Sequence, residues 1–128
     1  MRYQQKICLL CNQLYLSLTI FMKNILVIGS TGQIGSELTR ELRKRYGNDS
    51  IVAGYIQGAE PKGELKEGGP SAEADVTNPE MIADVVKKYN IDTIYNLAAL
   101  LSVVAEKKPQ LAWKIGIDGL WNILEVAR

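Results

Sequence analysis

A glycine-punctuated segment constrains the fold of this 128-residue chain more than any other feature. Gly29, Gly32 and Gly35 come directly after the short apolar run Ile25–Ile28. The stretch from Gln33 to Tyr46 then has helical periodicity, with apolar side chains at every fourth position, namely Ile34, Leu38, Leu42 and Tyr46. A buried strand, a tight turn and an amphipathic helix in this order predict the start of a βαβ unit in a parallel sheet.

The rest of the chain continues the same alternation. Strands are predicted at 50–56, 72–75 and 93–97, and a Gly- and Pro-rich surface loop is predicted at 57–73. Gly47 is expected to end the first helix, a second helix should begin at Asn78-Pro79-Glu80, and a last one should run from about Pro109 to the end of the chain. The pattern predicts an α/β fold, a Rossmann-type parallel sheet of about four strands with helices on both faces, forming the N-terminal half of such a fold.

The first 21 residues differ in character from residues 22–128. Residues 7–22 contain no charged side chain, and Arg2 and Lys6 precede them, as in a signal peptide. However, there is no small-x-small cleavage site, and the run is shorter than the roughly 20 apolar residues of a membrane span. We expect residues 1–21 to be an extension without a packed role and residues 22–128 to form an incomplete dinucleotide-binding domain. A membrane anchor is the alternative.

The composition excludes several classes of function. Fifteen basic and fourteen acidic residues give a formal charge of +1, so no basic field for nucleic acid is expected. The chain has no histidine, the commonest general base and metal ligand. Cys8 and Cys11 form an isolated C-x-x-C without a second pair to complete a zinc site, and we interpret them as two thiols in a reducing cytoplasm.

The glycine segment has the chemistry of a phosphate-binding turn. Backbone N–H groups at a helix N-terminus can donate to a pyrophosphate only where no Cβ obstructs its approach. Gly29 would permit the tight turn, Gly32 the close approach of the ligand, and Gly35 the packing of helix against strand. The neighbouring positions Thr31, Gln33 and Ile34 are expected to contact the same dinucleotide.

The adenosine end of the predicted site departs from the usual pattern. An acidic residue about 20 positions beyond the turn should receive the ribose hydroxyls, but Tyr55 stands there. No arginine replaces it to hold a 2′-phosphate, so NAD is expected as cofactor and NADP is not excluded. Asp75-Val76, after the third strand, is placed to contact adenine, although Asp75 could equally be a turn or helix-capping residue.

With these residues assembled, the chain resembles the extended short-chain dehydrogenase/reductase family, also described as NAD-dependent epimerases/dehydratases. The family's G-x-x-G-x-x-G signature matches the three glycines, and its Asp-Val pair matches Asp75-Val76. Its Leu-Ala-Ala matches Leu97, Ala98 and Ala99, whose backbone would line the cofactor, and its helix signature resembles residues 116–127. Residues 96–102, 105–107 and 109–113 are most similar to the epimerase-like L-threonine 3-dehydrogenases.

The resemblance implies an oxidoreductase that transfers hydride from a substrate hydroxyl carbon to NAD. It also implies a small-molecule substrate, with Ser102 as a candidate contact or else a loop serine, and a homodimer when complete. A nucleotide-sugar epimerase or dehydratase and a noncatalytic NAD(P)-sensing module are the alternatives.

Two family features are missing, and they leave enzymatic activity open. Gly116 replaces the asparagine that supports the catalytic water chain in the family. The catalytic Tyr-x-x-x-Lys is also absent, since Tyr89 and Tyr95 are followed four residues later by Thr93 and Ala99.

Removing residues 1–21 should leave cofactor binding unchanged, because their uncharged run lacks a polar face to orient it against a core. Calorimetric titration of the full chain and of residues 22–128 with NAD should give the same affinity, with equal or better solubility for the shorter chain. Membrane fractionation of the full chain alone would instead favour the anchor.

Overall fold

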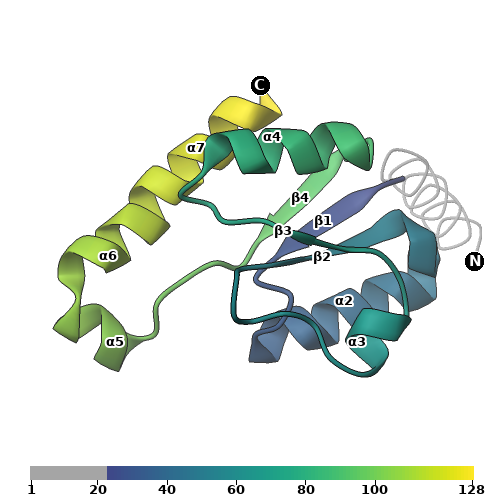
Figure 1. Ribbon diagram of the computed structural model, residues 1–128, viewed down its shortest axis with the longest axis horizontal. Coiled ribbons are helices and arrows are strands. Elements are labelled where there is room, and N and C mark those ends of the chain that lie inside the picture. The colour runs from purple at the N-terminus through teal and green to yellow at the C-terminus, as the bar shows by residue number, and fades with distance from the viewer. Residues whose placement is uncertain (1–22) are drawn as a thin grey trace, which may run out of the picture.

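The computed structural model describes residues 23–128, so the expectations for residues 1–21, including Cys8 and Cys11, lie outside the described part. A parallel four-stranded sheet with the order β3-β2-β1-β4 occupies the centre (Figure 1). Its strands are β1 (Ile25–Ile28), β2 (Ile51–Tyr55), β3 (Ser71–Glu73) and β4 (Thr93–Asn96). The predicted Rossmann-type α/β fold is confirmed.

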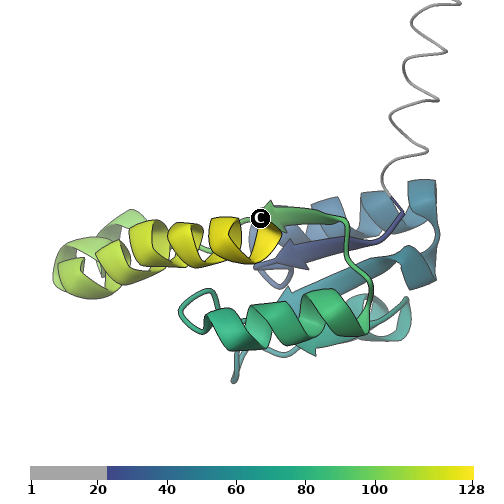
Figure 2. The same cartoon turned by 90° about the horizontal axis from the view of Figure 1, so that it is seen from above.

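Two helical layers cover the sheet because its central strand is apolar on both faces. Leu26 and Ile28 of β1 face a core with Val52 of β2, Ile82 of helix α4 (Pro79–Lys88) and Ile123 of helix α7 (Gly119–Ala127). The alternate residues Ile25 and Val27 pack with Ile51 and with Leu42 of helix α2 (Gln33–Tyr46) on the other face. In Figure 1, α4 and α7 lie above the sheet and α2 lies below it, and Figure 2 looks onto the sheet from the side of α4 and α7. The burial of all four β1 residues explains why its sequence does not alternate with polar residues.

The predicted helix boundaries at α2 and α4 are confirmed. Gly47 comes directly after α2 with φ +94°, and its N–H donates to the Arg43 carbonyl at 2.9 Å. At the start of α4, the Asn78 side chain accepts a hydrogen bond from the Met81 amide at 3.1 Å, and Pro79 occupies the first turn. The end of α2 and the start of α4 therefore have the capping residues that the sequence predicted.

The predicted loop at 57–73 is wrong in part, because it contains the one-turn helix α3 (Glu64–Glu67). Arg43 of α2 is buried and holds this segment to the helix. Its Nη1 donates to the Leu65 carbonyl at 2.7 Å and its Nη2 to the Pro70 carbonyl at 2.9 Å. Burial lowers the pKa of this guanidinium. The Arg43 side chain thus donates hydrogen bonds to carbonyl groups of residues 64–70, which contain too short a helix to pair these carbonyls internally.

Two short helical elements were not predicted. The 3₁₀ segment η1 (Asn48–Ser50) lies between α2 and β2, and helix α5 (Ser102–Lys107) precedes the predicted last helix. That last helix consists of α6 (Pro109–Trp113), a π-helical segment η2 (Lys114–Asp118) and α7, all in one continuous rod (Figure 1). No helix among residues 23–128 is long and apolar enough to cross a membrane.

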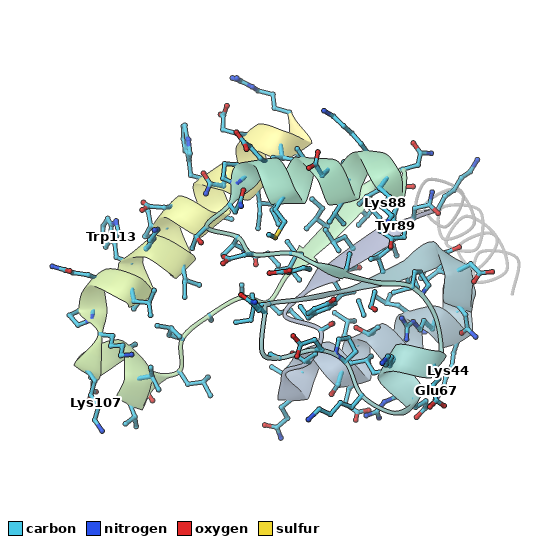
Figure 3. The ribbon with its side chains drawn as sticks, viewed as in Figure 1. Lys44, Glu67, Lys88, Tyr89, Lys107 and Trp113 are labelled. Atoms are coloured by element: carbon cyan, nitrogen blue, oxygen red, sulfur yellow. The ribbon has the colours of Figure 1, made fainter. Side chains whose placement is uncertain are left out.

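Three large apolar side chains of the helices are exposed, namely Ile34, Trp113 and Trp121. Ile34 of α2 is 72% exposed, because the first turn of the helix extends past the carboxyl end of β1. Trp113 and Trp121 are each 64% exposed, so neither packs in the core, and Trp113 projects from the rod in Figure 3. These tryptophans belong instead to an exposed apolar row on the rod, which consists of Trp113, Ile117, Leu120, Trp121 and Leu124.

Asp92 joins the start of β1 to the start of β4. Its Oδ2 accepts hydrogen bonds from the amides of Lys23 (2.8 Å) and Asn24 (3.0 Å), and its Oδ1 accepts one from the Thr93 hydroxyl (2.8 Å). Partial burial raises the pKa of this carboxyl, but the three hydrogen bonds and the nearby Lys23 charge together hold it below its ordinary value. The carboxylate thus fixes the register at which the central strand enters the sheet.

Two glycine-to-alanine substitutions should have opposite effects on stability. A Cβ at Gly35 would overlap the Gly29 carbonyl oxygen and lie 2.9 Å from Ser30 Cα, so Gly35→Ala should lower the free energy of unfolding by about 1–3 kcal/mol. A Cβ at Gly116, inside the rod, would meet no neighbour within 4 Å, so Gly116→Ala should raise it by about 0.5–1 kcal/mol. Urea unfolding followed by circular dichroism checks both, and equal changes would refute the packing role of Gly35.

Candidate functional site

The first glycine of the turn is required by its conformation and by its neighbours. Gly29 has φ +79°, in the left-handed region that favours glycine. A Cβ there would lie 3.1 Å from the carbonyl carbon and oxygen of Leu97, just beyond β4. The turn therefore passes tightly against the carboxyl end of the neighbouring strand.

The third glycine sets how closely α2 approaches the turn. Gly35 is buried in the first turn of the helix, where an added Cβ would overlap the Gly29 carbonyl oxygen. Within the helix, the buried Thr39 hydroxyl donates to the Gly35 carbonyl at 2.7 Å, so it has a partner inside α2. The N-terminus of α2 is thereby held directly beside the carboxyl end of β1.

The second glycine faces open space. A Cβ at Gly32 would have only the Gly29 carbonyl oxygen near it, at an ordinary contact distance of 3.4 Å. Gly32 precedes α2, and among the residues described no side chain caps this helix and none in its first turn is acidic. The first N–H groups of a helix have no partner within it and carry its positive dipole end. Turn and helix end therefore fit an anionic group such as a pyrophosphate.

Ser30 anchors the turn to the second strand, a role that the sequence did not reveal. Its amide and its hydroxyl both donate to the Gly54 carbonyl, at 3.0 and 2.9 Å, and the residue is fully buried. A small hydroxyl residue between the first two glycines was the available signal. The remaining predicted contacts from this turn, Thr31, Gln33 and Ile34, are exposed around it.

The predicted Leu97-Ala98-Ala99 segment lies immediately beside the turn. The Leu97 amide continues the β1–β4 pairing by donating to the Ile28 carbonyl at 3.0 Å. The Ala98 amide donates to the Asn96 side chain at 3.1 Å, so this chain end is ordered locally. The carboxyl ends of β1 and β4 meet here, which is the usual location of ligand sites in open parallel sheets.

Asp75 and Val76 are held by the protein itself. Asp75 Oδ1 accepts hydrogen bonds from both the amide and the hydroxyl of Thr77, each at 2.8 Å, which turns the chain toward α4. β3 ends at Glu73, two residues earlier than predicted. Val76 is buried, and its carbonyl accepts a hydrogen bond from Asn122 of α7 at 2.9 Å. Asp75 therefore has the turn role that the sequence left open as an alternative. Contact of Asp75 and Val76 with adenine stays a prediction.

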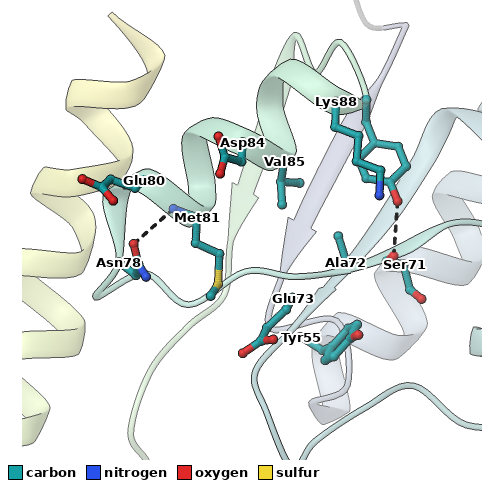
Figure 4. A pocket seen from close by; sticks show the side chains of 11 residues that line it. Tyr55, Ser71, Ala72, Glu73, Asn78, Glu80, Met81, Asp84, Val85 and Lys88 are labelled. Carbon is teal, nitrogen blue, oxygen red and sulfur yellow. Dashed lines mark hydrogen bonds between the residues drawn. The ribbon is translucent and has the colours of Figure 1, made fainter.

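Tyr55 and the glycine turn line two different hollows. It lines a hollow of about 540 Å³ between β3 and α4, together with residues such as Glu73, Met81 and Lys88 (Figure 4). Thr31 of the glycine turn lines a different hollow, between α2 and the segment after β2. Ser102 is separate again, exposed as the first residue of α5.

The comparisons with known proteins agree with this geometry. The model of the NAD dependent epimerase/dehydratase family matches residues 25–128. An uncharacterized epimerase/dehydratase of Staphylococcus epidermidis is 44% identical over 107 residues, which make up 84% of this chain and 33% of that protein. The chain thus spans about a third of the length of this curated relative.

Solved structures share the fold. The L-threonine dehydrogenase of Clostridium difficile superposes with a TM-score of 0.74 and 44% identity, covering 83% of this chain and 33% of the other. The UDP-glucose 4-epimerase of Thermus thermophilus, solved in complex with NAD, gives a TM-score of 0.71 at 23% identity over 80% of this chain and 33% of its own. At that identity the second likeness concerns the fold alone.

Gly32→Val should strongly weaken dinucleotide binding without disturbing the fold. The backbone at Gly32 has φ −73° and ψ 171°, which valine adopts readily, and the space around its Cβ is open. The side chain would then occupy the space that a pyrophosphate needs. Calorimetry with NAD should show at least about a tenfold loss of affinity with an unchanged circular dichroism spectrum, and Gly32→Ala should give a smaller loss. Unchanged affinity of the valine variant would refute this role of the turn.

Proposed function

Since this chain belongs to the NAD dependent epimerase/dehydratase family, we propose that it is the NAD-binding part of an L-threonine 3-dehydrogenase. The observation that carries the NAD-binding part of this proposal is the combination of an uncapped helix N-terminus with a glycine turn that is closed at Gly35 and open at Gly32. The L-threonine dehydrogenase of Clostridium difficile is 44% identical over 83% of this chain, which favours threonine dehydrogenase as the activity of the complete protein.

In this proposal each part of the turn has its own task. The backbone N–H groups at the start of α2 bind the pyrophosphate, while Thr31, Gln33 and Ile34 line its path. The backbone of Leu97, Ala98 and Ala99 positions the rest of the dinucleotide at the carboxyl end of β4. NAD, when bound, supplies the acceptor for hydride from a hydroxyl-bearing carbon. Ser102 is assigned to orient the substrate.

The proton transfer must be supplied from outside this chain. The reaction needs an acid–base group beside the reacting carbon, and its loss typically lowers the rate by about 10²–10⁴. The chain has neither histidine nor a Tyr-x-x-x-Lys, so the proposal assigns it cofactor positioning and a substrate contact at Ser102, but no acid–base group. A cytoplasmic homodimer with a small-molecule substrate is the proposed setting of the complete protein.

The purified chain should bind NAD but form no NADH with L-threonine. A chimera in which residues 23–128 replace the matching third of the Clostridium difficile enzyme should restore threonine-dependent NADH formation, because the rest of that enzyme would complete the site. In this chimera, Ser102→Ala should raise KM for L-threonine by about threefold to tenfold with little change in kcat.

Calorimetric titration with NAD measures whether the 128-residue chain and the chimera bind the cofactor. Turnover by the 128-residue chain alone would mean that an acid–base group has been missed. A chimera that binds NAD but oxidises no threonine would favour the noncatalytic sensing module, and absence of NAD binding by the chain would refute the proposal.

A further inference from the structure

The tyrosine at position 55 leaves the adenosine ribose of NAD without its expected acceptor. Carboxylates suit this position because they accept hydrogen bonds from the ribose hydroxyls and repel the 2′-phosphate of NADP. Tyr55 has no carboxylate with which to repel a 2′-phosphate. Its side chain lines the hollow between β3 and α4. Any carboxylate that binds the ribose in this chain would therefore come from another segment near the glycine turn.

Such a segment lies directly beside the turn. A hollow of about 300 Å³ separates the start of α2 from residues 60–65, the continuation of the chain after β2. Thr31 and Ser36 contribute hydroxyls from the turn side, and the opposite wall includes Glu60, Lys62 and Glu64. The hollow therefore adjoins the place where the pyrophosphate would lie and contains groups of both charges.

The far wall of this hollow is fixed to α2. Pro61 and Leu65 are buried, and Arg43 holds the Leu65 carbonyl at 2.7 Å. The Arg43 bond to Pro70 then fastens the end of the segment. The backbone of this segment is consequently held against α2 at its buried residues.

Of the two carboxylates, Glu60 is the one prepared to accept a further hydrogen bond. Its Oε1 accepts the Gly58 amide at 2.9 Å, and this bond, the largest cause, lowers the pKa of the carboxyl. The residue is exposed, so its carboxylate stays open to a ligand hydroxyl. Glu64 faces Arg40 instead, with 3.9 Å between Glu64 Oε2 and Arg40 Nε.

We infer that Glu60 replaces the missing carboxylate and accepts the adenosine ribose 2′-hydroxyl of NAD, which makes it the residue that selects NAD over NADP. The inference rests on the proposed function, because it requires NAD at the Gly29–Gly35 turn. Arg40 and Lys62 line the same hollow, and their positive charges would attract the 2′-phosphate of NADP. A preference for NADP is therefore the opposite outcome of the test.

The test compares Glu60→Gln with Glu64→Gln, which removes an equal charge from the same hollow. The full 128-residue chain is titrated calorimetrically with NAD, with NADP and with the NAD analogue that lacks the adenosine 2′-hydroxyl. Glu60→Gln should weaken NAD binding by about tenfold and narrow the preference for NAD over NADP, whereas Glu64→Gln should leave NAD affinity within about twofold.

The analogue separates a direct contact from a change of loop structure. The wild-type chain should bind NAD about tenfold more tightly than the analogue, and in Glu60→Gln this difference should shrink to less than about threefold. Equal effects of the two variants, an unchanged analogue ratio, or a wild-type preference for NADP would overturn the role of Glu60. Absence of NAD binding by the wild-type chain would refute the proposed function itself.

Discussion

The close approach of α2 to the turn after β1 is the constraint on which the remaining structure depends. Gly35 has no Cβ, so the helix can begin against the Gly29 carbonyl, and Gly29 in turn passes against Leu97. Ser30 ties the same turn to Gly54 of β2. One turn thus fixes the ends of three neighbouring strands and directs an uncapped helix N-terminus to the edge where they meet. Both the packing of the core and the candidate site depend on this arrangement.

The packed glycines of this turn stand beside one glycine that faces open space. Two of the three glycines are closed by protein atoms, while Gly32 alone opens outward. A turn needed only for compactness would have no reason to keep a Cβ away from the open side, since alanine at position 32 would clash with nothing.

Patterns within a single element predicted the fold well, whereas features that depend on contacts between distant segments were missed. The apolar run of β1, the periodicity of α2 and the Asn78 cap are local, so the sequence carries them directly. Arg43 has the sequence context of a surface residue, and only the folded chain brings the Leu65 carbonyl to it. Glu60 was likewise hidden, because a loop position gives no periodicity from which its neighbours could be inferred. The predicted contacts with cofactor and substrate remain predictions.

The central position of the first strand has a consequence for the order of folding. β1 pairs with β2 through Ile25–Ile51 and with β4 through Ile25–Thr93, so one of its edges pairs only with residues far along the chain. During synthesis, the most apolar strand therefore leaves the ribosome well before its second neighbour exists. Loop closure over such separations slows folding, and an unpaired apolar edge promotes association in the meantime. A nascent chain of this topology gains from a chaperone that shields this edge until β4 has emerged.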